Sequence, residues 1–256
     1  MNTNKIKQWL EVGQVVVGPY IGEFYTAGLA GIVASCGADF VIFDYEHSGW
    51  GPEALRTQLA LARGAGLVPI VNSPGAKFER EGLLLDMGAM GLMVPHVRTA
   101  KQAEEIVEAT RYAPRGNRGG AFGIAHDFFR ARQIGKTIAD ANDSILIIAK
   151  LESRQAIDNA REILSVPGID VALVTAFDLA LDMGLGADVD HPDITAAMSM
   201  VRDICQELGK VPGCAAFTPD VARQRVAEGY RFIQYSWDIG LLQEGLTAGI
   251  AAVRGR

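Results

Sequence analysis

The chain has 256 residues, of which 49% are hydrophobic and 21% are charged, and its formal net charge at pH 7 is -6. This composition fits one globular domain, and the negative charge argues against attraction to nucleic acid or to an anionic membrane. No apolar run reaches the roughly 18 residues of a membrane span, and the first residues lack the apolar core of a signal peptide. We therefore expect a cytoplasmic protein whose partners are small molecules, with no nucleic acid and no membrane among them.

Short apolar runs alternate with segments of helical periodicity along the whole chain. The runs are QVVVG near residue 14, DFVIFD at 39, VPIVN at 68, GLMVP at 91, ILIIAKLE at 145, DVALVT at 170, VPGCA at 211 and RFIQYS at 231. Strands without polar alternation are buried on both faces, and eight of them in about 250 residues are typical of a closed barrel. The sequence therefore predicts an α/β fold, a parallel eight-stranded (β/α)8 TIM barrel, with a doubly wound open sheet as the alternative.

One spacing between strands is longer than a βα unit requires. The run at 145 begins 54 residues after the run at 91, and the extra segment includes RGNRGGAFGIAHDFF. We interpret residues 1–256 as a single barrel domain with an inserted loop around residues 113–144. Its glycines and the side chains of Arg118, Phe122 and His126 suggest a loop that borders the mouth of the barrel and binds substrate. A contact between subunits made by the same aromatic residues is an equal alternative.

Catalytic residues of such barrels lie at the carboxyl ends of the strands. The polar residues found there are His47, Asn72, Ser73, His96, Lys150, Glu152 and Asp178. Strand periodicity puts Lys150 and Glu152 on one face, which we expect to be the inner one. Asp178 follows Glu152 by 26 residues, one βα unit, so the two carboxylates are expected on neighbouring strands, where they could bind one divalent cation.

Each of these residues also has a structural interpretation. Asp178 could cap the helix that follows it, and Asp86 could cap a helix in the same way. Glu152 could form a structural ion pair with Lys150. The chain has three cysteines, Cys36, Cys205 and Cys214. They are too few and too scattered for a disulfide framework or a zinc site, and we expect all three to be buried apolar residues.

Several motifs together resemble those of the class II pyruvate-dependent aldolases typified by 4-hydroxy-2-oxoheptanedioate aldolase, the HpcH/HpaI type. GADFVIFDYEHSGWG is similar to the family's Asp-x-Glu-His block, LLLDMGAMGLMVPHV to its Leu-Asp-x-Gly-Ala-x-Gly block, and RYAPRGNRGG to its Tyr-Pro-Pro-x-Gly-x-Arg-Gly block. The resemblance covers roughly residues 10 to 245. It implies a (β/α)8 barrel, a hexamer built as a trimer of dimers that exchange the last helix, and a bound Mg, Mn or Co ion.

The resemblance also implies a role for several residues. Glu152 and Asp178 take the positions of the metal ligands, and His47 takes that of the group that activates water or moves a proton. Asp44 and Asp86 would orient His47. A divalent ion chelated by a 2-oxo acid stabilises the enolate formed on carbon-carbon cleavage, and a histidine held by carboxylates can move the aldol proton near neutral pH.

Three positions depart from the family pattern. Asn72 stands where the family has a functional arginine, and Lys150 stands where it usually has glutamine. The turn that holds the substrate carboxylate, Gly-Pro-Ala-Asp in the family, is here Thr175 to Asp178, so that Ala176 and Phe177 would line the substrate site. One cation has therefore been lost from a strand end and one gained at another.

Three interpretations of Lys150 remain open. It could supply the positive charge missing at Asn72 and act in catalysis, although as a point charge without the bidentate fork of arginine. It could instead occupy the place of the metal ion, or the site could have lost the aldol reaction.

Three functions follow from these residues. The first is a metal-dependent carbon-carbon lyase that cleaves or forms 4-hydroxy-2-oxo acids from a 2-oxo acid and an aldehyde through a pyruvate-type enolate. The second is other enolate chemistry, a condensation or a decarboxylation. The third is a barrel that binds 2-oxo acids without catalysis.

Overall fold

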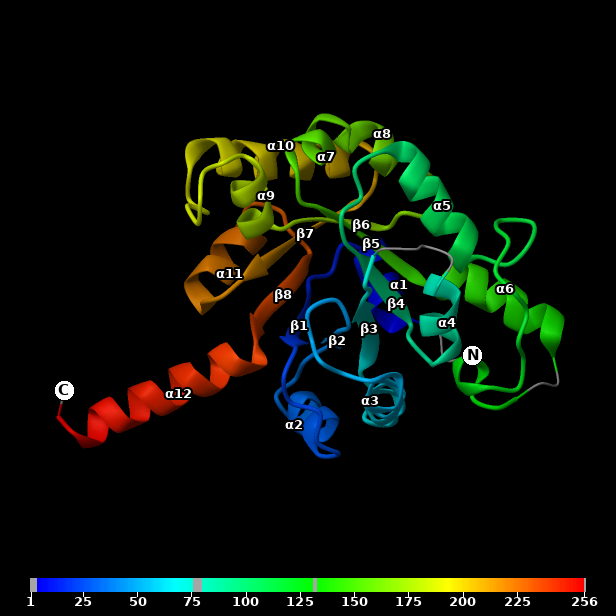
Figure 1. Cartoon of the computed structure of the whole chain (residues 1–256), viewed down its shortest axis with the longest axis horizontal. Helices are drawn as coiled ribbons and strands as arrows, with labels where there is room; N and C mark the ends of the chain where they lie inside the picture. The colour runs from blue at the N-terminus through cyan, green and yellow to red at the C-terminus, as the bar shows by residue number, and fades with distance from the viewer. Residues whose placement is uncertain (1–3, 76–79, 131–132, 256) are drawn as a thin grey trace.

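The computed structural model describes residues 4–75, 80–130 and 133–255, and in these ranges the chain forms a closed parallel barrel (Figure 1). The strands follow each other around the barrel in chain order, and β8 closes on β1. Their bounds are β1 Val16–Ile21, β2 Phe40–Asp44, β3 Val68–Asn72, β4 Gly91–Val94, β5 Leu146–Leu151, β6 Val171–Val174, β7 Val211–Ala216 and β8 Phe232–Trp237. The predicted TIM barrel is confirmed, and each strand begins within a predicted apolar run.

The helices surround this barrel. Their bounds are α1 Lys5–Glu11, α2 Leu29–Ser35, α3 Pro52–Gly64, α4 Glu81–Asp86, α5 Ala100–Thr110, α6 Ile134–Ser144, α7 Arg154–Asp158, α8 Ala160–Ser165, α9 Ala176–Asp182, α10 Pro192–Glu207, α11 Pro219–Ala227 and α12 Asp238–Val253. Two of the segments with helical periodicity, GPEALRTQLALARGAG and TAKQAEEIVEATRYAP, contain α3 and α5. Alternate strand residues point outward and pack with these helices, which gives the larger of two apolar clusters.

The smaller cluster fills the inside of the barrel. It consists of inward residues of the strands together with Ile6 and Leu10 of α1. Inside the barrel the rings of Phe40 and Phe232 stack with their centroids 4.5 Å apart, and both side chains are fully buried. The barrel is therefore a packed core, and its polar inward residues lie above this apolar plug, at the carboxyl ends of the strands.

The inserted segment is more ordered than the predicted loop. It contains the short 3-10 helix η2, Ala125–Asp127, and the helix α6, which packs through Thr137, Ala141 and Asn142. These buried residues are small or polar, so the sequence pattern did not indicate a helix. Residues 131–132 of the predicted loop lie outside the described ranges.

The three cysteines differ in their exposure. Cys36 is exposed, whereas Cys205 and Cys214 are buried, so the expectation of three buried cysteines was wrong for Cys36. That residue lies at the C-terminal end of α2, which packs on the barrel through Leu29, Ala30 and Val33 instead. Within the described residues, no helix is long and apolar enough to cross a membrane.

Candidate active site

Lys150 belongs to the inward series of strand β5. Leu146 and Ile148 lie in the cluster inside the barrel, whereas Leu151 packs outside it with the helices. Because side chains alternate along a strand, Lys150 continues the inward series one step above Ile148. It is 7% exposed, and Glu152, directly after the strand, is 5% exposed. The sequence thus places two opposite charges in a buried position at the mouth of the barrel.

The Lys150 ammonium contacts two carboxylates. Its Nζ lies 2.7 Å from Glu152 Oε1 and 3.2 Å from Glu46 Oε2. Glu46 follows β2, which is separated from β5 by two strands, so the contact with Glu46 crosses the mouth of the barrel. Lys150 therefore links two sides of the mouth.

Asn72 is the last inward residue of strand β3, as Lys150 is of strand β5. Asn72 is paired with Asp44 in the register of β2 and β3, and it is fully buried. Its Nδ2 donates to Tyr20 Oη at 2.9 Å, to Asp44 Oδ1 at 3.1 Å and to Glu46 Oε2 at 3.0 Å. The side chains of Asn72 and Lys150 thus meet at the same oxygen of Glu46.

The turn after β2 carries His47. Asp44 Oδ1 accepts the backbone N–H groups of Glu46 at 2.9 Å and His47 at 3.2 Å, which fixes the path of the chain. The His47 side chain is 72% exposed, and its Nε2 lies 3.5 Å from Glu46 Oε2. Asp44 therefore orients the backbone that carries His47, and the imidazole remains open to a ligand.

His96, after β4, bridges the two glutamates. Its backbone N–H donates to Glu152 Oε2 at 2.9 Å, and its Nδ1 and Nε2 lie 3.2 Å from Glu152 Oε2 and 3.4 Å from Glu46 Oε1. The φ angle of His96 is 58°, in the left-handed region that costs free energy for residues other than glycine. Strained residues of this kind are frequent at functional sites.

We call this set the mouth cluster. It comprises Tyr20, Asp44, Glu46, His47, Asn72, His96, Lys150 and Glu152. The sequence analysis identified most of these residues, but it gave no role to Glu46 or Tyr20. Glu46 could have been found from the strand period, because it lies two residues after Asp44.

The charges of the mouth cluster shift its pKa values. Burial lowers the pKa of Lys150, but the carboxylates of Glu152 and Glu46 raise it by more, so the net shift is upward and the ammonium persists. Burial acts against ionisation of Glu152 as well, and Lys150 and the His96 N–H outweigh it, so the pKa of Glu152 is lowered. The pKa of Tyr20 is raised by burial and by the charges of Asp44 and Glu46.

Asp178 lies beside this cluster, in the first turn of α9. The N-cap of α9 is Thr175, so Asp178 does not cap the helix. Burial and the charge of Glu152 raise the pKa of Asp178, which shows that the two carboxylates are close enough to interact. Ala176 and Phe177 precede Asp178 in the same turn, and Phe177 is half exposed.

The donor set fits a divalent cation. Asp44, Glu46, Glu152 and Asp178 supply four carboxylates, and Lys150 is the one lysine or arginine among the described residues of the mouth cluster. No ready-made group of three or more His, Cys, Asp or Glu ligands occurs within the described ranges. Magnesium, however, commonly binds one or two carboxylates together with water and substrate oxygens. Glu152 and Asp178 supply two carboxylates of this kind. A cation at Glu152 would displace Lys150 from that carboxylate, and Lys150 would keep a second partner in Glu46.

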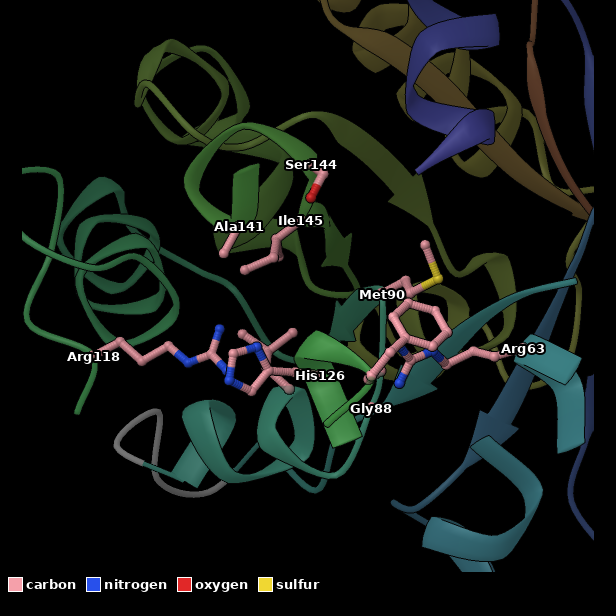
Figure 2. Close-up of a pocket in the computed structure, with 11 residues that line it drawn as sticks. Arg63, Gly88, Met90, Arg118, His126, Ala141, Ser144 and Ile145 are labelled. Carbon is pink, nitrogen blue, oxygen red and sulfur yellow. The ribbon is translucent and has the colours of Figure 1, made fainter. Parts of the chain in front are cut away.

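Asp86 and Arg118 pair with each other, away from this site. Arg118 Nη2 donates to Asp86 Oδ1 at 2.5 Å, and no ion pair within 4.0 Å joins His47 to Asp86 in the described ranges. Figure 2 shows Arg118 and His126 lining a pocket together with Met90 and Ile145. These last two residues directly precede β4 and β5, so the pocket lies at the amino ends of the strands.

Within a single chain, Arg118 and Phe122 of the inserted loop therefore lie away from the mouth cluster, and their contact with substrate stays a prediction. The Phe122 ring packs against Tyr112 and His126, with centroids 5.6 Å and 6.1 Å apart. Arg118 stacks over the Tyr112 ring at 4.7 Å. These contacts hold the loop against Tyr112, which follows α5 and bonds Asn142 of α6.

The chain is similar over almost its whole length to known proteins. It is 32% identical over 249 residues to the 2-keto-3-deoxy-L-rhamnonate aldolase of Escherichia coli O157:H7, which covers 97% of this chain and 92% of that protein. The structure of the HpcH/HpaI aldolase from Desulfitobacterium hafniense DCB-2 superposes with a TM-score of 0.92 at 28% identity, covering 97% and 96% of the two chains. Citrate synthase SbnG superposes with a TM-score of 0.86 at 25% identity, covering 98% and 97%.

The comparison of family profiles agrees with these relatives. Residues 24–244 match the family described as HpcH/HpaI aldolase/citrate lyase, and this range includes every strand from β2 to β8 and most of the mouth cluster. The resemblance seen in the sequence motifs is confirmed. The chain belongs to the HpcH/HpaI aldolase/citrate lyase family.

Proposed function

We propose that the protein is a carbon-carbon lyase that cleaves 4-hydroxy-2-oxo acids to a pyruvate-type 2-oxo acid and an aldehyde, or joins the two in reverse. The observation that carries the proposal is the gathering of His47, Lys150, Glu152 and Asp178 at the carboxyl ends of the barrel strands. The relative from Escherichia coli is named as an aldolase for a 2-keto-3-deoxy acid, which supports this substrate class.

Retro-aldol cleavage needs a base, a site for negative charge and an acid. The base removes the proton of the C4 hydroxyl, the C3–C4 bond breaks, and the C4 carbon leaves as the aldehyde carbonyl. The bonding electrons move onto the enolate, whose charge lies mainly on the C2 oxygen, and protonation at C3 then gives the 2-oxo acid product. Each of these tasks needs a group within reach of the mouth of the barrel.

We assign the proton transfer to His47. Its imidazole is exposed at the mouth and lies 3.5 Å from the Glu46 carboxylate, while Asp44 holds its backbone. A histidine in this setting can accept and return a proton near neutral pH. A role for Asp86 in orienting His47 stays a prediction, and within one chain Asp86 is engaged by Arg118.

We assign the cation site to Glu152 and Asp178, with Mg, Mn or Co as the ion. When bound there, the ion would act as a Lewis acid on the 2-oxo acid oxygens. Asn72, Ala176 and Phe177 are proposed to contact the substrate, because Asn72 lies in the mouth cluster and the other two begin α9 beside Asp178. Substrate contacts by Arg118 and Phe122 would require a second chain.

A condensation is the second candidate function. Citrate synthase SbnG shares this fold over nearly the whole chain, and the name of that protein describes a carbon-carbon condensation. The same enolate, formed at the same residues, would then attack a different acceptor.

The test is pyruvate release from a panel of 4-hydroxy-2-oxo acids, measured with added Mg or Mn and after chelation. Turnover that depends on the metal supports the proposal in full. A wild-type protein that binds 2-oxo acids but converts none of the panel would contradict the lyase assignment. Mass spectrometry of mixtures with other acceptors would then distinguish condensation from a non-catalytic binding barrel.

We also propose that the protein is a homo-oligomer, with a hexamer built from dimers as the family resemblance implies. The last helix α12 extends away from the barrel in Figure 1. Its exposed apolar residues are Leu241, Leu242, Leu246, Ile250 and Val253. A helix that exposes a row of large apolar side chains needs a covering surface, which supports pairing with a second copy. Light scattering on wild type and on Leu242→Glu tests this: a monomeric wild type would contradict it.

A further inference from the structure

We propose that Lys150 binds the C2 oxygen of the 2-oxo acid and stabilises the negative charge that develops there. This inference rests on the proposed function and names the residue that meets the substrate oxyanion.

The position of Lys150 is set by the barrel. Its side chain continues the inward series of β5 above Ile148, and only 9% of it is exposed. The ammonium is held at the level of Glu46 and Glu152 rather than free in solvent. A charge held in this way costs little reorganisation when a negative oxygen forms beside it.

The Lys150 ammonium has three N–H donors, and its two carboxylate partners leave one of them for a ligand. Glu152 is one of the two proposed cation ligands, and Lys150 also contacts Glu46 at 3.2 Å. A cation bound at Glu152 would compete with Lys150 for that carboxylate, and Glu46 would still hold the ammonium in the mouth. The ammonium and a cation held by Glu152 and Asp178 would then both lie at the carboxyl end of the barrel, where the substrate is proposed to bind.

The charge of the site gives the strongest reason for this role. Four carboxylates lie at or beside the mouth cluster, so an anionic 2-oxo acid meets repulsion except at Lys150 and at a bound cation. A purely structural Lys150–Glu152 pair has little to recommend it, because burying such a pair is often no better for stability than an apolar replacement.

Asn72 offers a second position from which an ammonium can be placed in the mouth, so the effect of the charge can be separated from the effect of Lys150 itself. Its Nδ2 donates to the same Glu46 oxygen that Lys150 contacts, at 3.0 Å. A lysine at position 72 would therefore bring an ammonium to the same oxygen from strand β3. The double variant Lys150→Gln with Asn72→Lys moves the charge and keeps it in the mouth.

The experiment is a calorimetric titration with oxalate, a planar dianion that has the shape of the pyruvate enolate. It is carried out at fixed Mg on wild type, Lys150→Met, Lys150→Gln and the double variant. Lys210→Met is the matched control. Lys210 is a half-buried lysine whose Nζ donates a hydrogen bond to the Ile169 carbonyl at the other end of the barrel. Binding of Mn is measured separately for each variant, so that loss of the metal is not mistaken for loss of the charge.

We expect Lys150→Met and Lys150→Gln to weaken oxalate binding at least about 10-fold while Mn binding is kept or strengthened. The double variant should recover part of the loss, and Lys210→Met should bind as wild type does. Equal oxalate affinity in wild type and Lys150→Met would overturn the inference, and so would a wild type that does not bind oxalate. Trapping of a pyruvate adduct on Lys150 by borohydride would overturn it too, since it would show a neutral, nucleophilic amine.

Failure of the lyase assignment and failure of the inference about Lys150 give different results. If oxalate binding depends on Lys150 but no 4-hydroxy-2-oxo acid is cleaved, the lyase assignment fails and the role of Lys150 in binding the oxyanion stands. If cleavage occurs at the wild-type rate in Lys150→Met, the lyase assignment stands and the inference about Lys150 fails.

Discussion

Two levels of the barrel interior differ by a single step along each strand. On β2, β3 and β5 the inward residues Ile42, Ile70 and Ile148 are fully buried in the apolar cluster. The next inward residues are Asp44, Asn72 and Lys150, and all three belong to the mouth cluster. The comparison teaches that the strands stabilise the fold through one level and carry the chemistry on the level above it. Substitutions at the two levels should therefore have different effects.

The largest effect on stability is expected from Phe40→Ala in the same apolar cluster, one inward step below Ile42 on β2. Phe40 is fully buried and stacks on Phe232, so the truncation leaves a cavity inside the barrel. The free energy of unfolding should fall by about 3–5 kcal/mol, as is typical for Phe→Ala in a core. Denaturant titration measures this loss, and the KM of the protein that remains folded should not change. A changed KM with unaltered stability would break the distinction between the two levels.

The largest effect on rate is expected from His47→Asn in the mouth cluster. The side chain is mostly exposed, and the Glu46 carboxylate is its one ion-pair partner among the described residues, so its loss should leave the melting temperature unchanged. The kcat for pyruvate release should fall by about 10²- to 10⁴-fold, the usual contribution of a general base. The control is His191→Asn, which alters a helix cap on α10 and should keep the wild-type rate. Equal rates in wild type and His47→Asn would remove His47 from the mechanism.

A pH-dependent effect is expected at Glu81, which lies outside the mouth cluster. Burial raises the pKa of Glu81 from 4.5 to about 7, although the Ser73 hydroxyl, 2.8 Å away, lowers it. Because the folded-state pKa is above the unfolded one, stability is greatest below the unfolded value and is lost as the pH rises toward the folded value. The loss is on the order of 3 kcal/mol at full ionisation.

Glu81→Gln removes this titration and keeps the shape of the side chain. The melting temperature of wild type should fall more than that of the variant between about pH 5 and about pH 8. Parallel changes in the two proteins would show that folding does not raise the pKa of Glu81 above its value in the unfolded chain.

The smallest effect is expected from Asp86→Asn, which weakens the pair with the buried Arg118. Asn keeps an acceptor for the guanidinium but loses its charge, so unfolding should become easier by about 1–2 kcal/mol. A thermal scan measures this change. If kcat falls instead and the melting temperature holds, Asp86 acts on the histidine, as the family resemblance implies, through a second copy of the chain.

The fold was predictable because its signal is local. Each strand is a short run such as DFVIFD or DVALVT, without the polar alternation of a half-exposed sheet, and the following helices have clear periodicity. Helix α6 was missed because Ala141 and Asn142, on its buried face, are too small or too polar to form an apolar stripe. The position of the inserted loop was also missed, because it depends on tertiary contacts such as that of Phe122 with Tyr112.

The site was predictable in its residues more than in its pairings. Strand ends identified His47, Lys150, Glu152 and Asp178 from periodicity and family resemblance. The contact of Lys150 with Glu46 joins residues 104 positions apart across the mouth, and strand spacing alone does not specify such a contact. The pairing of Asp86 with Arg118 is likewise a tertiary contact, between α4 and the segment after α5.

The most direct test of the central claim is the exchange of the pyruvate methyl protons in deuterated water, followed by nuclear magnetic resonance. Exchange requires only the enolate, so it is independent of the unidentified aldehyde. The account predicts that wild type with Mg removes the methyl proton signal, that Glu152→Gln and Lys150→Met do so at least about 10²-fold more slowly, and that Lys210→Met matches wild type. Absence of exchange in wild type, or equal exchange in wild type and Glu152→Gln, would contradict the claim that the mouth cluster stabilises an enolate.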